Sequence, residues 1–387
     1  MPILNRAAEM QDEIAGWRRH IHQNPELQYD VIETARFVEQ KLKEFGCDEV
    51  VPGIGRTGVV GLIKGRLGDG GVVGLRADMD ALPIREITGK PYASKNPGKM
   101  HACGHDGHTA MLLGAAKYLA ETRNFAGAVA VIFQPAEEGG AGGLAMVKDG
   151  MMDRFGIQKV YGMHNMPGLP LGHFAIRPGP IMAATAEFTI TVKGRGGHAA
   201  QPHRTIDPVV VGSHLVVALQ TVASRSTDPV DSVVVTVTKF HGGDAYNVIP
   251  EQVEIAGTVR TLRKEVAANT RERMQAICEG IAATFAASIH FDFDANYPVT
   301  VNDPEQTVFA GDIATTIAGE TQVHRAVQPL MGGEDFSYML EARPGAFIFI
   351  GNGESANLHH PAYDFNDEVI PHGVSYWVKL AETSLAA

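Results

Sequence analysis

Short apolar runs separated by helical segments constrain this 387-residue chain to an α/β fold. Four such runs, predicted as buried strands, occupy Gly58–Ile63, Gly71–Leu75, Ala128–Phe133 and Lys159–Met163. The last three are each followed closely by polar side chains, and in α/β sheets ligand-binding groups collect at the carboxyl ends of strands. We therefore expect a functional site that is assembled from several strand ends.

The stretch Met100–His108, MHACGHDGH, has the composition of a metal-binding loop. Cys103 and His105 stand one residue apart, so in an extended turn both side chains can point to the same side. Thiolate and imidazole are good ligands for zinc and similar divalent ions. The apolar segment Thr109–Glu121 predicts a helix directly after this loop. The alternative is an ordinary loop with a buried cysteine.

Acidic residues and a histidine follow the predicted strands. Asp78 and Asp80 follow the second strand, and we expect a function for Asp80, whereas Asp78 fits a site or a solvated turn equally well. The pair Glu137 and Glu138 follows the third strand and precedes a glycine-rich loop. Neighbouring carboxylates in an extended segment point different ways, so one can bind an ion while the other faces its bound water. His164 ends the fourth strand in the same manner.

A second pattern begins near Ala183, where strands of alternating polarity replace the continuous apolar runs. The order of elements is β-α-β-β-α-β, the ferredoxin-like arrangement. The predicted strands and helices of this module are Glu187–Val192, Ile206–Ser224, Ser232–Phe240, Gln252–Leu262, Glu265–Ala287 and Ile289–Ala295. We place it at 184–297, inserted into a domain formed by 1–183 and 298–387, because exposed loops tolerate insertions.

Composition limits the partners and the compartment. The net charge is −11 and no basic tract is present, which argues against nucleic acid or an anionic membrane as a partner. The sparse cysteines Cys47, Cys103 and Cys278 argue against a disulfide framework and fit a reducing compartment. Neither a signal-peptide pattern nor a long apolar span is visible, so we expect a cytoplasmic protein.

Further histidines lie outside these strands. His20 and His22 occupy a helix–turn segment without an evident acidic partner, and we predict structural roles for them. Glycines flank His198, so its imidazole could approach a ligand closely. His359 or His360, in the segment NLHHP, would complete a metal shell.

Two polar positions accompany the strands of the inserted module. Asn247 and Arg260 each lie beside apolar residues, and an arginine in that setting suits bidentate recognition of a carboxylate. Taken singly, each is more typical of surface decoration than of a site.

The complete set of motifs resembles the hippurate hydrolase branch of the M20 metallopeptidase family. That branch includes N-acyl-amino-acid amidohydrolases, carboxypeptidase-like aminoacylases and plant auxin-conjugate hydrolases. The resemblance covers nearly the whole chain, in order, through RRHIHQNPEL, LRADMDALPI, MHACGHDGHTA, FQPAEEG, GMHN, GRGGHAA, NVIP, GGEDFSY and LHHPAYDFND. It implies a catalytic α/β/α domain with an inserted ferredoxin-like lid domain, through which we expect a homodimer or a higher homo-oligomer.

The resemblance also implies a site for two divalent metal ions, for which zinc, manganese, nickel and cobalt all fit a mixed sulfur, nitrogen and oxygen shell. The implied ligands are Cys103, His105, Glu138, His164 and His359. Cys103 resembles the ligand that can bridge both ions, where related branches use an aspartate. Many relatives have Asn, Ser or Thr after the last histidine, whereas this chain has His360, so register alone assigns His359.

The remaining site residues receive roles from the same resemblance. Glu137 matches the general base and Asp80 matches the acidic residue that orients the site. His198 matches the lid histidine that stabilises the oxyanion, in its own subunit or across a dimer. Asn247 and Arg260 resemble the groups that hold the substrate carboxylate.

The expected activity is hydrolysis of small N-acyl amino acids, such as hippurate or N-acetyl amino acids, by metal-activated water. A dipeptidase, a carboxypeptidase or another small-amide deacylase would use the same two-metal shell. A binding protein with a decayed site is the non-enzymatic alternative. The intact pair Glu137 and Glu138 argues against it.

Overall fold

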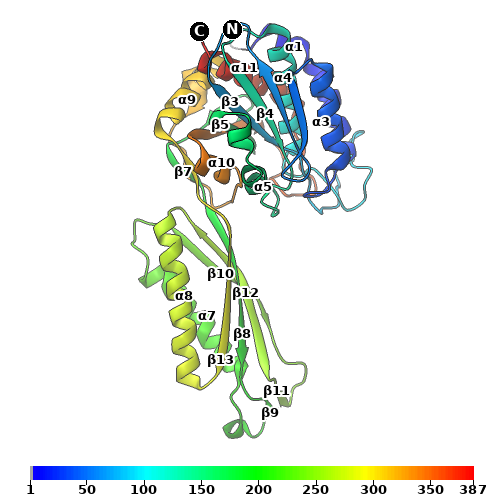
Figure 1. Ribbon diagram of the computed structural model, residues 1–387. Helices are drawn as coiled ribbons and strands as arrows, with labels where there is room; N and C mark the ends of the chain where they lie inside the picture. Colours follow the sequence, from blue (N-terminus) through cyan, green and yellow to red (C-terminus); the bar gives the residue numbers. More distant parts are fainter. Residues whose placement is uncertain (1–2) are drawn as a thin grey trace. The chain divides into compact units, whose positions relative to one another are not determined.

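The computed structural model describes residues 3–387 and divides the chain into two compact units (Figure 1). Unit 1 comprises Met1–Ile181, Thr300–Gln328 and Asp335–Ala387, and unit 2 comprises Met182–Val299 and Pro329–Glu334. Unit 2 therefore interrupts unit 1 twice in the sequence. It contains the predicted module 184–297 and, in addition, the short segment 329–334, which the sequence analysis had assigned to the other domain.

Unit 1 contains an eight-stranded mixed sheet in the order β1-β2-β4-β3-β5-β16-β6-β15. The four central strands β4, β3, β5 and β16 run parallel to one another, whereas β2 and β6 pair antiparallel with this group. The strands are β1 (Glu49–Ile54), β2 (Gly58–Lys64), β3 (Val72–Asp78), β4 (Ala128–Gln134), β5 (Ile157–Pro167), β6 (Phe174–Ala175), β15 (Val323–His324) and β16 (Gly345–Gly353). The four predicted apolar runs form β2, β3, β4 and β5, which confirms an α/β fold.

Helices surround this sheet, together with a two-stranded ribbon of β7 (Gly179–Met182) and β14 (Thr300–Asn302). The helices are α1 (Asn5–Glu9), α2 (Gln11–Gln23), α3 (Ile32–Glu44), α4 (His105–Thr122), α5 (Gly142–Lys148), α6 (Met151–Arg154), α9 (Pro304–Ala318), α10 (Ser337–Ala342) and α11 (Ile370–Ser384), with 3-10 turns η2 (Glu320–Gln322) and η3 (Asp367–Val369). Among the residues that the structure describes, no helix is both long and apolar enough to cross a membrane.

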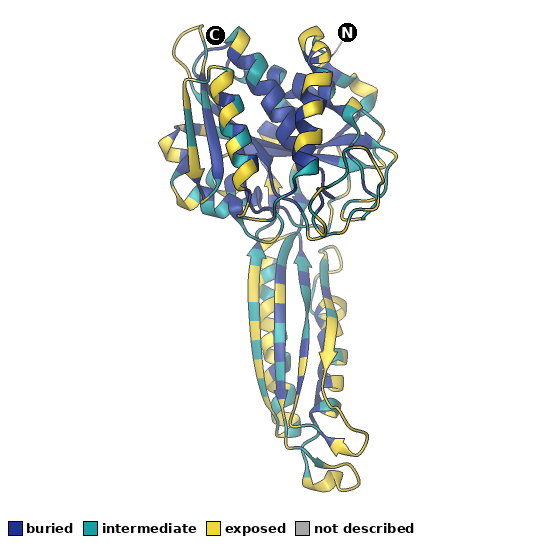
Figure 2. Cartoon of the chain, turned by 90° about the vertical axis from the view of Figure 1, so that its right-hand side faces the viewer, coloured by how far each residue is buried: buried dark blue, intermediate teal, exposed yellow. Residues whose placement is uncertain are grey.

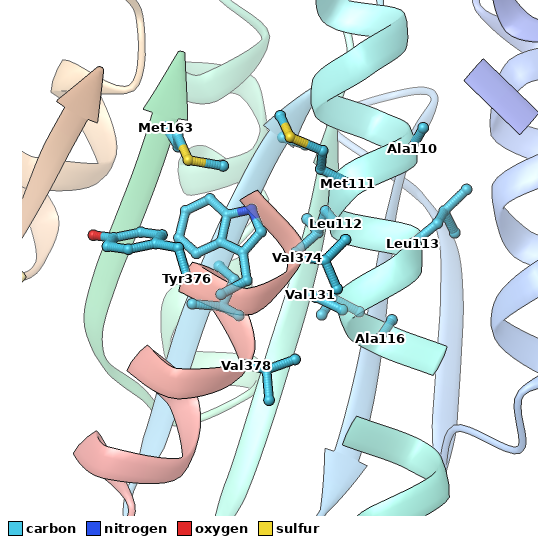
Figure 3. Close-up of a cluster of buried hydrophobic side chains, with 14 of the residues drawn as sticks. Ala110, Met111, Leu112, Leu113, Ala116, Val131, Met163, Val374, Tyr376 and Val378 are labelled. Carbon is cyan, nitrogen blue, oxygen red and sulfur yellow. The ribbon is translucent and has the colours of Figure 1, made fainter. Parts of the chain in front are cut away.

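Helix α4 is the centre of the unit 1 core. It is buried along most of its length because it packs against β3 and contacts both α2 and α11. Met111 and Leu112 of α4 pack with Met163 of β5 and Val374 of α11 (Figure 3). The two helices approach so closely that a Cβ at Gly373 would lie 2.2 Å from the sulfur of Met111. The first turn of α4, which carries His105, is buried as well.

Strand β3 presents different chemistry to the two faces of the sheet. Leu75 and Ala77 join the hydrophobic core that α4 and α11 share. Arg76, between them, points the other way because successive side chains of a strand alternate, and it is fully buried. It donates to Asp335, just ahead of α10. An apolar face therefore stabilises the sheet, and a buried polar layer lies behind the strand ends.

Unit 2 is a ferredoxin-like βαββαβ module with an antiparallel sheet in the order β10-β12-β8-β13. Exposed and buried residues alternate along its strands, whereas buried residues dominate the sheet of unit 1 (Figure 2). Its elements are β8 (Ala184–Lys193), β9 (Gly197–His198), η1 (Pro202–Arg204), α7 (Pro208–Arg225), β10 (Val233–His241), β11 (Val248–Ile249), β12 (Gln252–Thr261), α8 (Lys264–Phe285) and β13 (Ser288–Tyr297).

Local sequence determines where the helices of both units begin. Asp207 caps α7 by accepting a hydrogen bond from the Val209 amide at 2.9 Å, and Pro208 occupies the first turn. Asp303 caps α9 in the same way, ahead of Pro304. Aspartate followed by proline is a start signal that needs no tertiary context, so the start of α7 was predictable to within two residues.

Candidate metal centre

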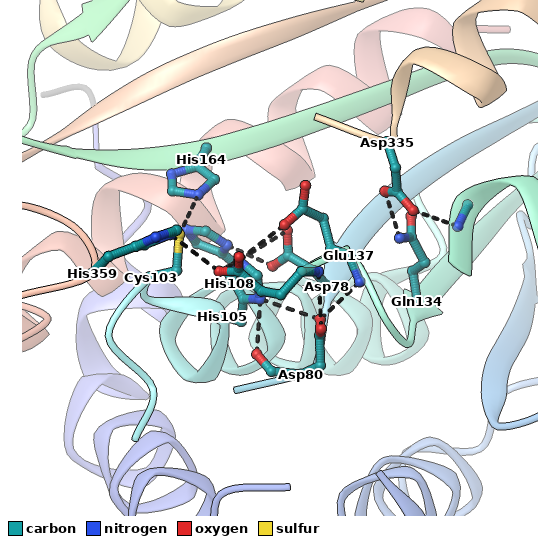
Figure 4. Close-up of polar contacts among 12 residues, drawn as sticks. Asp78, Asp80, Cys103, His105, His108, Gln134, Glu137, His164, Asp335 and His359 are labelled. Atoms are coloured by element: carbon teal, nitrogen blue, oxygen red, sulfur yellow. Dashed lines mark hydrogen bonds and ion pairs between the residues drawn. The ribbon is translucent and has the colours of Figure 1, made fainter. Parts of the chain in front are cut away.

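Polar side chains from several strands meet at the carboxyl edge of the unit 1 sheet (Figure 4). Strand β3 ends at Asp78, β4 ends at Gln134, and β5 carries His164 near its carboxyl end. Cys103 and the first residue of α4, His105, reach the same edge. Because parallel strands share one carboxyl edge, residues far apart in the sequence become neighbours there.

The candidate ligand atoms form overlapping groups in which all atoms lie within 4.8 Å of one another. Three of these groups are Cys103 with His105 and His164, Cys103 with Glu138 and His359, and His105 with Glu137 and Glu138. The sulfur of Cys103 belongs to the first two groups and joins them. The fold thus brings together the five predicted ligands, with Glu137 beside them.

Cys103 is buried, and its environment disfavours the thiolate. Its sulfur lies 3.3 Å from Nε2 of His164. Burial, together with the nearby carboxylates of Glu138 and Glu137, raises the pKa of the Cys103 thiol well above its ordinary value. Burial also lowers the pKa of His164 well below its ordinary value. A neutral imidazole can bind a metal cation directly, whereas the thiol must lose its proton before its sulfur can bind the cation.

His105 has one ring nitrogen engaged and the other available. Its Nδ1 lies 2.8 Å from the backbone oxygen of Asp80 and donates to it. Its Nε2 is buried but has no hydrogen-bond partner among residues 3–387. Buried nitrogens are rarely left unpaired, and a metal ion would satisfy this one. Although burial opposes it, the carboxylates of Asp78 and Asp80 raise the pKa of His105 to about 10.

Asp80 holds the turn that carries the two glutamates. One carboxylate oxygen accepts from the amide of Glu137 and the other from the amide of Glu138, both at 3.0 Å. Asp80 is itself buried, and burial raises the pKa of its carboxyl group. With two consecutive backbone amides fixed, the glutamate side chains leave the turn in defined directions.

The structure distinguishes between the two adjacent histidines near the carboxyl terminus. Nε2 of His359 lies 3.3 Å from Oε1 of Glu138, within the ligand cluster. His359 has a φ of +63°, an uncommon conformation that aims its side chain at the cluster. His360 belongs to none of the candidate ligand groups among the described residues, and its Nδ1 accepts a hydrogen bond from the Ala362 amide at 3.0 Å.

The three predicted residues of unit 2 fall into two places within that unit. His198 pairs with Val248, and the backbone oxygen of Asn247 accepts from the amide next to His198. Both lie beyond the end of β12 that begins at Gln252. Arg260 lies eight residues after Gln252 on the same strand, which places it about 26 Å from that end of β12 at the usual rise per residue. His198 and Asn247 are therefore neighbours, whereas Arg260 is remote from them within one copy of unit 2.

The sequence analysis did not decide whether Asp78 belongs to the site, and it did not predict the residues that contact Asp78. Asp78 is buried, and its carboxylate lies 2.7 Å from Nδ1 of His108 and accepts from Arg76 at 2.7 Å. Nε2 of His108 in turn lies 2.7 Å from Oδ1 of Asn165. These residues form a polar layer beneath His105. The one available signal was the spacing of His105 and His108, since residues three apart share a helix face.

The sequence analysis was wrong about the surroundings of His22. It was expected to lack an acidic partner, yet its Nδ1 lies 2.8 Å from Asp106 and its Nε2 lies 3.4 Å from Glu86. The fully buried Arg18 also contacts Asp106, at 3.5 Å. Asp106 is 84 residues away in the sequence, so only the tertiary fold reveals this partner.

A cavity of about 470 Å³ adjoins the ligand cluster. Leu27, Tyr29, Ala81 and Pro83 line it together with the polar residues Gln28, Asp30 and Glu138. Tyr29 is fixed by a 2.8 Å hydrogen bond from its hydroxyl to the backbone oxygen of Gly140. This volume is typical of sites for small molecules, and the lining combines apolar and polar side chains.

The fold and the clustered donor atoms define a protein with a candidate metal centre, and comparison with known proteins identifies its family. The model of peptidase family M20/M25/M40 matches residues 74–383. The chain is 44% identical over 381 residues to hippurate hydrolase of Campylobacter jejuni, covering 98% of this chain and 99% of that one. It is 43% identical over 362 residues to N-acetyl-L-cysteine deacetylase of Bacillus subtilis, covering 93% and 85%. The chain therefore belongs to family M20.

A solved structure agrees. A dinuclear metal-binding peptidase of family M20 from Bacillus subtilis superimposes with a TM-score of 0.85 at 36% identity, covering 98% of this chain and 99% of that one. The resemblance to the hippurate hydrolase branch is confirmed, and the protein is a hydrolase of linear amide bonds that uses divalent metal.

Proposed function

We propose that this protein cleaves the amide bond of N-acyl amino acids and releases a carboxylic acid and a free amino acid. The observation that carries the proposal is the sulfur of Cys103, which joins two ligand groups while Glu137 lies beside them. The relatives support the substrate class, because hippurate and N-acetyl-L-cysteine are both N-acyl amino acids.

We infer that two divalent ions bind, one at Cys103, His105 and His164, and one at Cys103, Glu138 and His359. The two ligand groups and the dinuclear centre of the M20 relative support this assignment. The mixed donor set suits zinc, manganese, nickel or cobalt. Such ions lower the pKa of a water molecule and polarise a carbonyl group when they are bound.

Glu137 is the proposed proton carrier. It is buried beside His105, and Asp80 orients its backbone. As general base it would accept a proton from the attacking water and return it to the leaving amine. Glu138 is unsuited to this role because His359 and Cys103 engage its carboxylate.

We propose further that the protein works as a homodimer. A small substrate cannot contact both Arg260 and the His198–Asn247 pair of one copy, since about 26 Å of β12 separates them. In the proposed dimer, Arg260 and the His198–Asn247 pair contact one substrate molecule from different subunits, with Arg260 binding the substrate carboxylate. His198 would donate a hydrogen bond to the developing oxyanion.

A substrate panel tests the proposal. The purified protein is stripped with a chelator, reloaded with each of the four metals and assayed on hippurate, N-acetyl amino acids and dipeptides. We expect N-acyl amino acids to be hydrolysed and amides without a free α-carboxylate to be poor substrates. A preference for dipeptides would favour the dipeptidase or carboxypeptidase alternative. A fully metal-loaded protein that hydrolyses nothing in the panel would contradict the proposal.

A further inference from the structure

Asp335 is not one of the five predicted ligands, yet its carboxylate lies within 4.8 Å of that of Glu137 and contacts the loop that carries both glutamates. Asp335 is fully buried at the start of the last unit 1 segment. One carboxylate oxygen accepts hydrogen bonds from Nε2 of Gln134 at 2.7 Å and from Nη2 of Arg76 at 3.1 Å. The other accepts from the backbone amide of Gly143 at 2.8 Å.

Two of these partners mark the two ends of one loop. Gln134 is the last residue of β4, and Gly143 lies in the first turn of α5. The loop between them, residues 135–142, carries Glu137 and Glu138. One carboxylate therefore fixes the entry and the exit of this loop, while Asp80 fixes its middle.

The exit of the loop is packed too tightly for a side chain. A Cβ added at Gly143 would lie 2.8 Å from the backbone oxygen of Asp335 and 3.2 Å from its Oδ2. Residue 143 must therefore be glycine for the Asp335 carboxylate to reach the amide. These close contacts, and not the backbone conformation, require a glycine here, since the φ of Gly143 is not in the left-handed region.

Arg76 extends the same network to the polar layer beneath His105. This fully buried guanidinium donates to Gln134 at 2.9 Å and to Asp78 at 2.7 Å, in addition to Asp335. Two carboxylates and one amide oxygen thus surround it, which compensates for the cost of burying its charge. Asp335 contacts both ends of the glutamate loop directly.

We propose that Asp335 is a positioning residue for catalysis, which holds the loop so that Glu138 meets the metal and Glu137 faces the reacting water. This inference rests on the proposed function for its kinetic consequence, but not for its consequence for metal binding. A carboxylate is required because both oxygens accept hydrogen bonds from N–H groups. An asparagine would direct its own N–H₂ at one of these donors.

The test uses Asp335→Asn in the full-length protein, with Asp303→Asn as the matched control. Asp303 is a half-buried helix cap in the same unit and lies outside the network. We expect Asp335→Asn to lower kcat by about 10- to 100-fold with little change in KM, because a small misplacement of catalytic groups is costly. We expect it to weaken Co²⁺ affinity by about 10-fold and to alter the visible absorption spectrum of the Co²⁺-loaded protein. Asp303→Asn should change neither property.

A second variant keeps the inference testable if Asp335→Asn does not fold. Gly143→Ala retains every charge but forces the loop exit away from Asp335, and it should reproduce the fall in kcat and the changed Co²⁺ spectrum. Wild-type kcat, Co²⁺ affinity and Co²⁺ spectrum in a folded variant would overturn the inference. If the wild-type protein hydrolysed no N-acyl amino acid, the proposed function would fail, while the Co²⁺ measurements would still decide the role of Asp335.

Discussion

The sulfur of Cys103 lies 3.3 Å from Nε2 of His164, and burial pushes the pKa values of the two groups in opposite directions. The thiol keeps its proton and the imidazole loses its own, so neither group carries a charge before metal binds. A buried site can hold these groups close together at little electrostatic cost in this state. The consequence is that metal binding must displace protons.

We therefore expect metal affinity to rise with pH. At neutral pH the metal-free protein holds a proton on Cys103, whose pKa is raised, and one on His105, whose pKa is about 10. If both protons leave, the association constant for Zn²⁺ should increase about 100-fold per pH unit between pH 6 and 8. Calorimetric titration in buffers of different ionisation enthalpy measures the proton count.

Cys103→Asp is the control for this proton count, because a carboxylate brings no proton to lose at that pH. The dependence on pH should fall to about 10-fold per unit. An affinity that does not change with pH in the wild-type protein would contradict the prediction.

Substitution of the two adjacent glutamates should separate catalysis from metal binding. Glu137→Gln should keep both ions and lose about 10²- to 10⁴-fold in kcat, the usual contribution of a general base. Glu138→Gln should lose one ion per subunit, because the Glu138 carboxylate forms one ligand group with Cys103 and His359. Elemental analysis after dialysis, together with steady-state kinetics, distinguishes the two outcomes. Equal metal loss in both variants would contradict the assignment of Glu137 as general base and Glu138 as metal ligand.

The histidine doublet offers a test with an internal control. His359→Ala should lower the metal content and abolish most activity, since Nε2 of His359 lies 3.3 Å from Glu138. His360→Ala should retain both, since among the described residues its side chain belongs to no candidate ligand group and accepts a hydrogen bond from a local backbone amide. The reverse pattern in elemental analysis would show that the register of this segment is wrong.

Subunit mixing tests the proposed dimer. His198→Ala and Arg260→Ala should each be nearly inactive alone. If the two residues serve one active site from different subunits, heterodimers obtained by coexpression will contain one intact site and regain activity. A mixture as inactive as its components would indicate that both residues act within one subunit. Sedimentation analysis of the same samples verifies that dimers form.

His22 should make stability depend on pH. Burial opposes its protonation, but the carboxylates of Asp106 and Glu86 raise its pKa to about 9, above the unfolded value of about 6.5. Its contribution is therefore fully present below pH 6.5 and is lost as pH rises through 9. That contribution is on the order of 3 kcal/mol.

The corresponding variant is His22→Gln, compared with His20→Gln at a nearby exposed position. Thermal denaturation should show that the difference between wild type and His22→Gln is largest near pH 6 and shrinks towards pH 10. His20→Gln should match the wild-type protein throughout. A His22→Gln difference that stays constant with pH would exclude the charged His22–Asp106 contact.

Much of the architecture could be predicted from the local pattern of apolar and polar residues alone. Apolar runs specified β2, β3, β4 and β5, because a strand buried on both faces needs continuous apolar sequence. Alternating polarity specified the strands of unit 2, each of which has only one buried face. The motif order indicated the family, and the polar residues after each strand indicated the edge at which the site lies.

Tertiary structure decided which polar residues meet. Asp335 contacts Arg76 across 259 positions in the sequence, and no periodicity relates two residues that far apart. The choice of His359 over His360 depends on a positive φ, and the orientation of Glu137 and Glu138 depends on Asp80 accepting from both of their amides. Local sequence therefore determined the elements and the kinds of ligand, because short-range sterics and burial govern both. Side-chain direction and long-range pairing were determined only when the sheet brought its strand ends together.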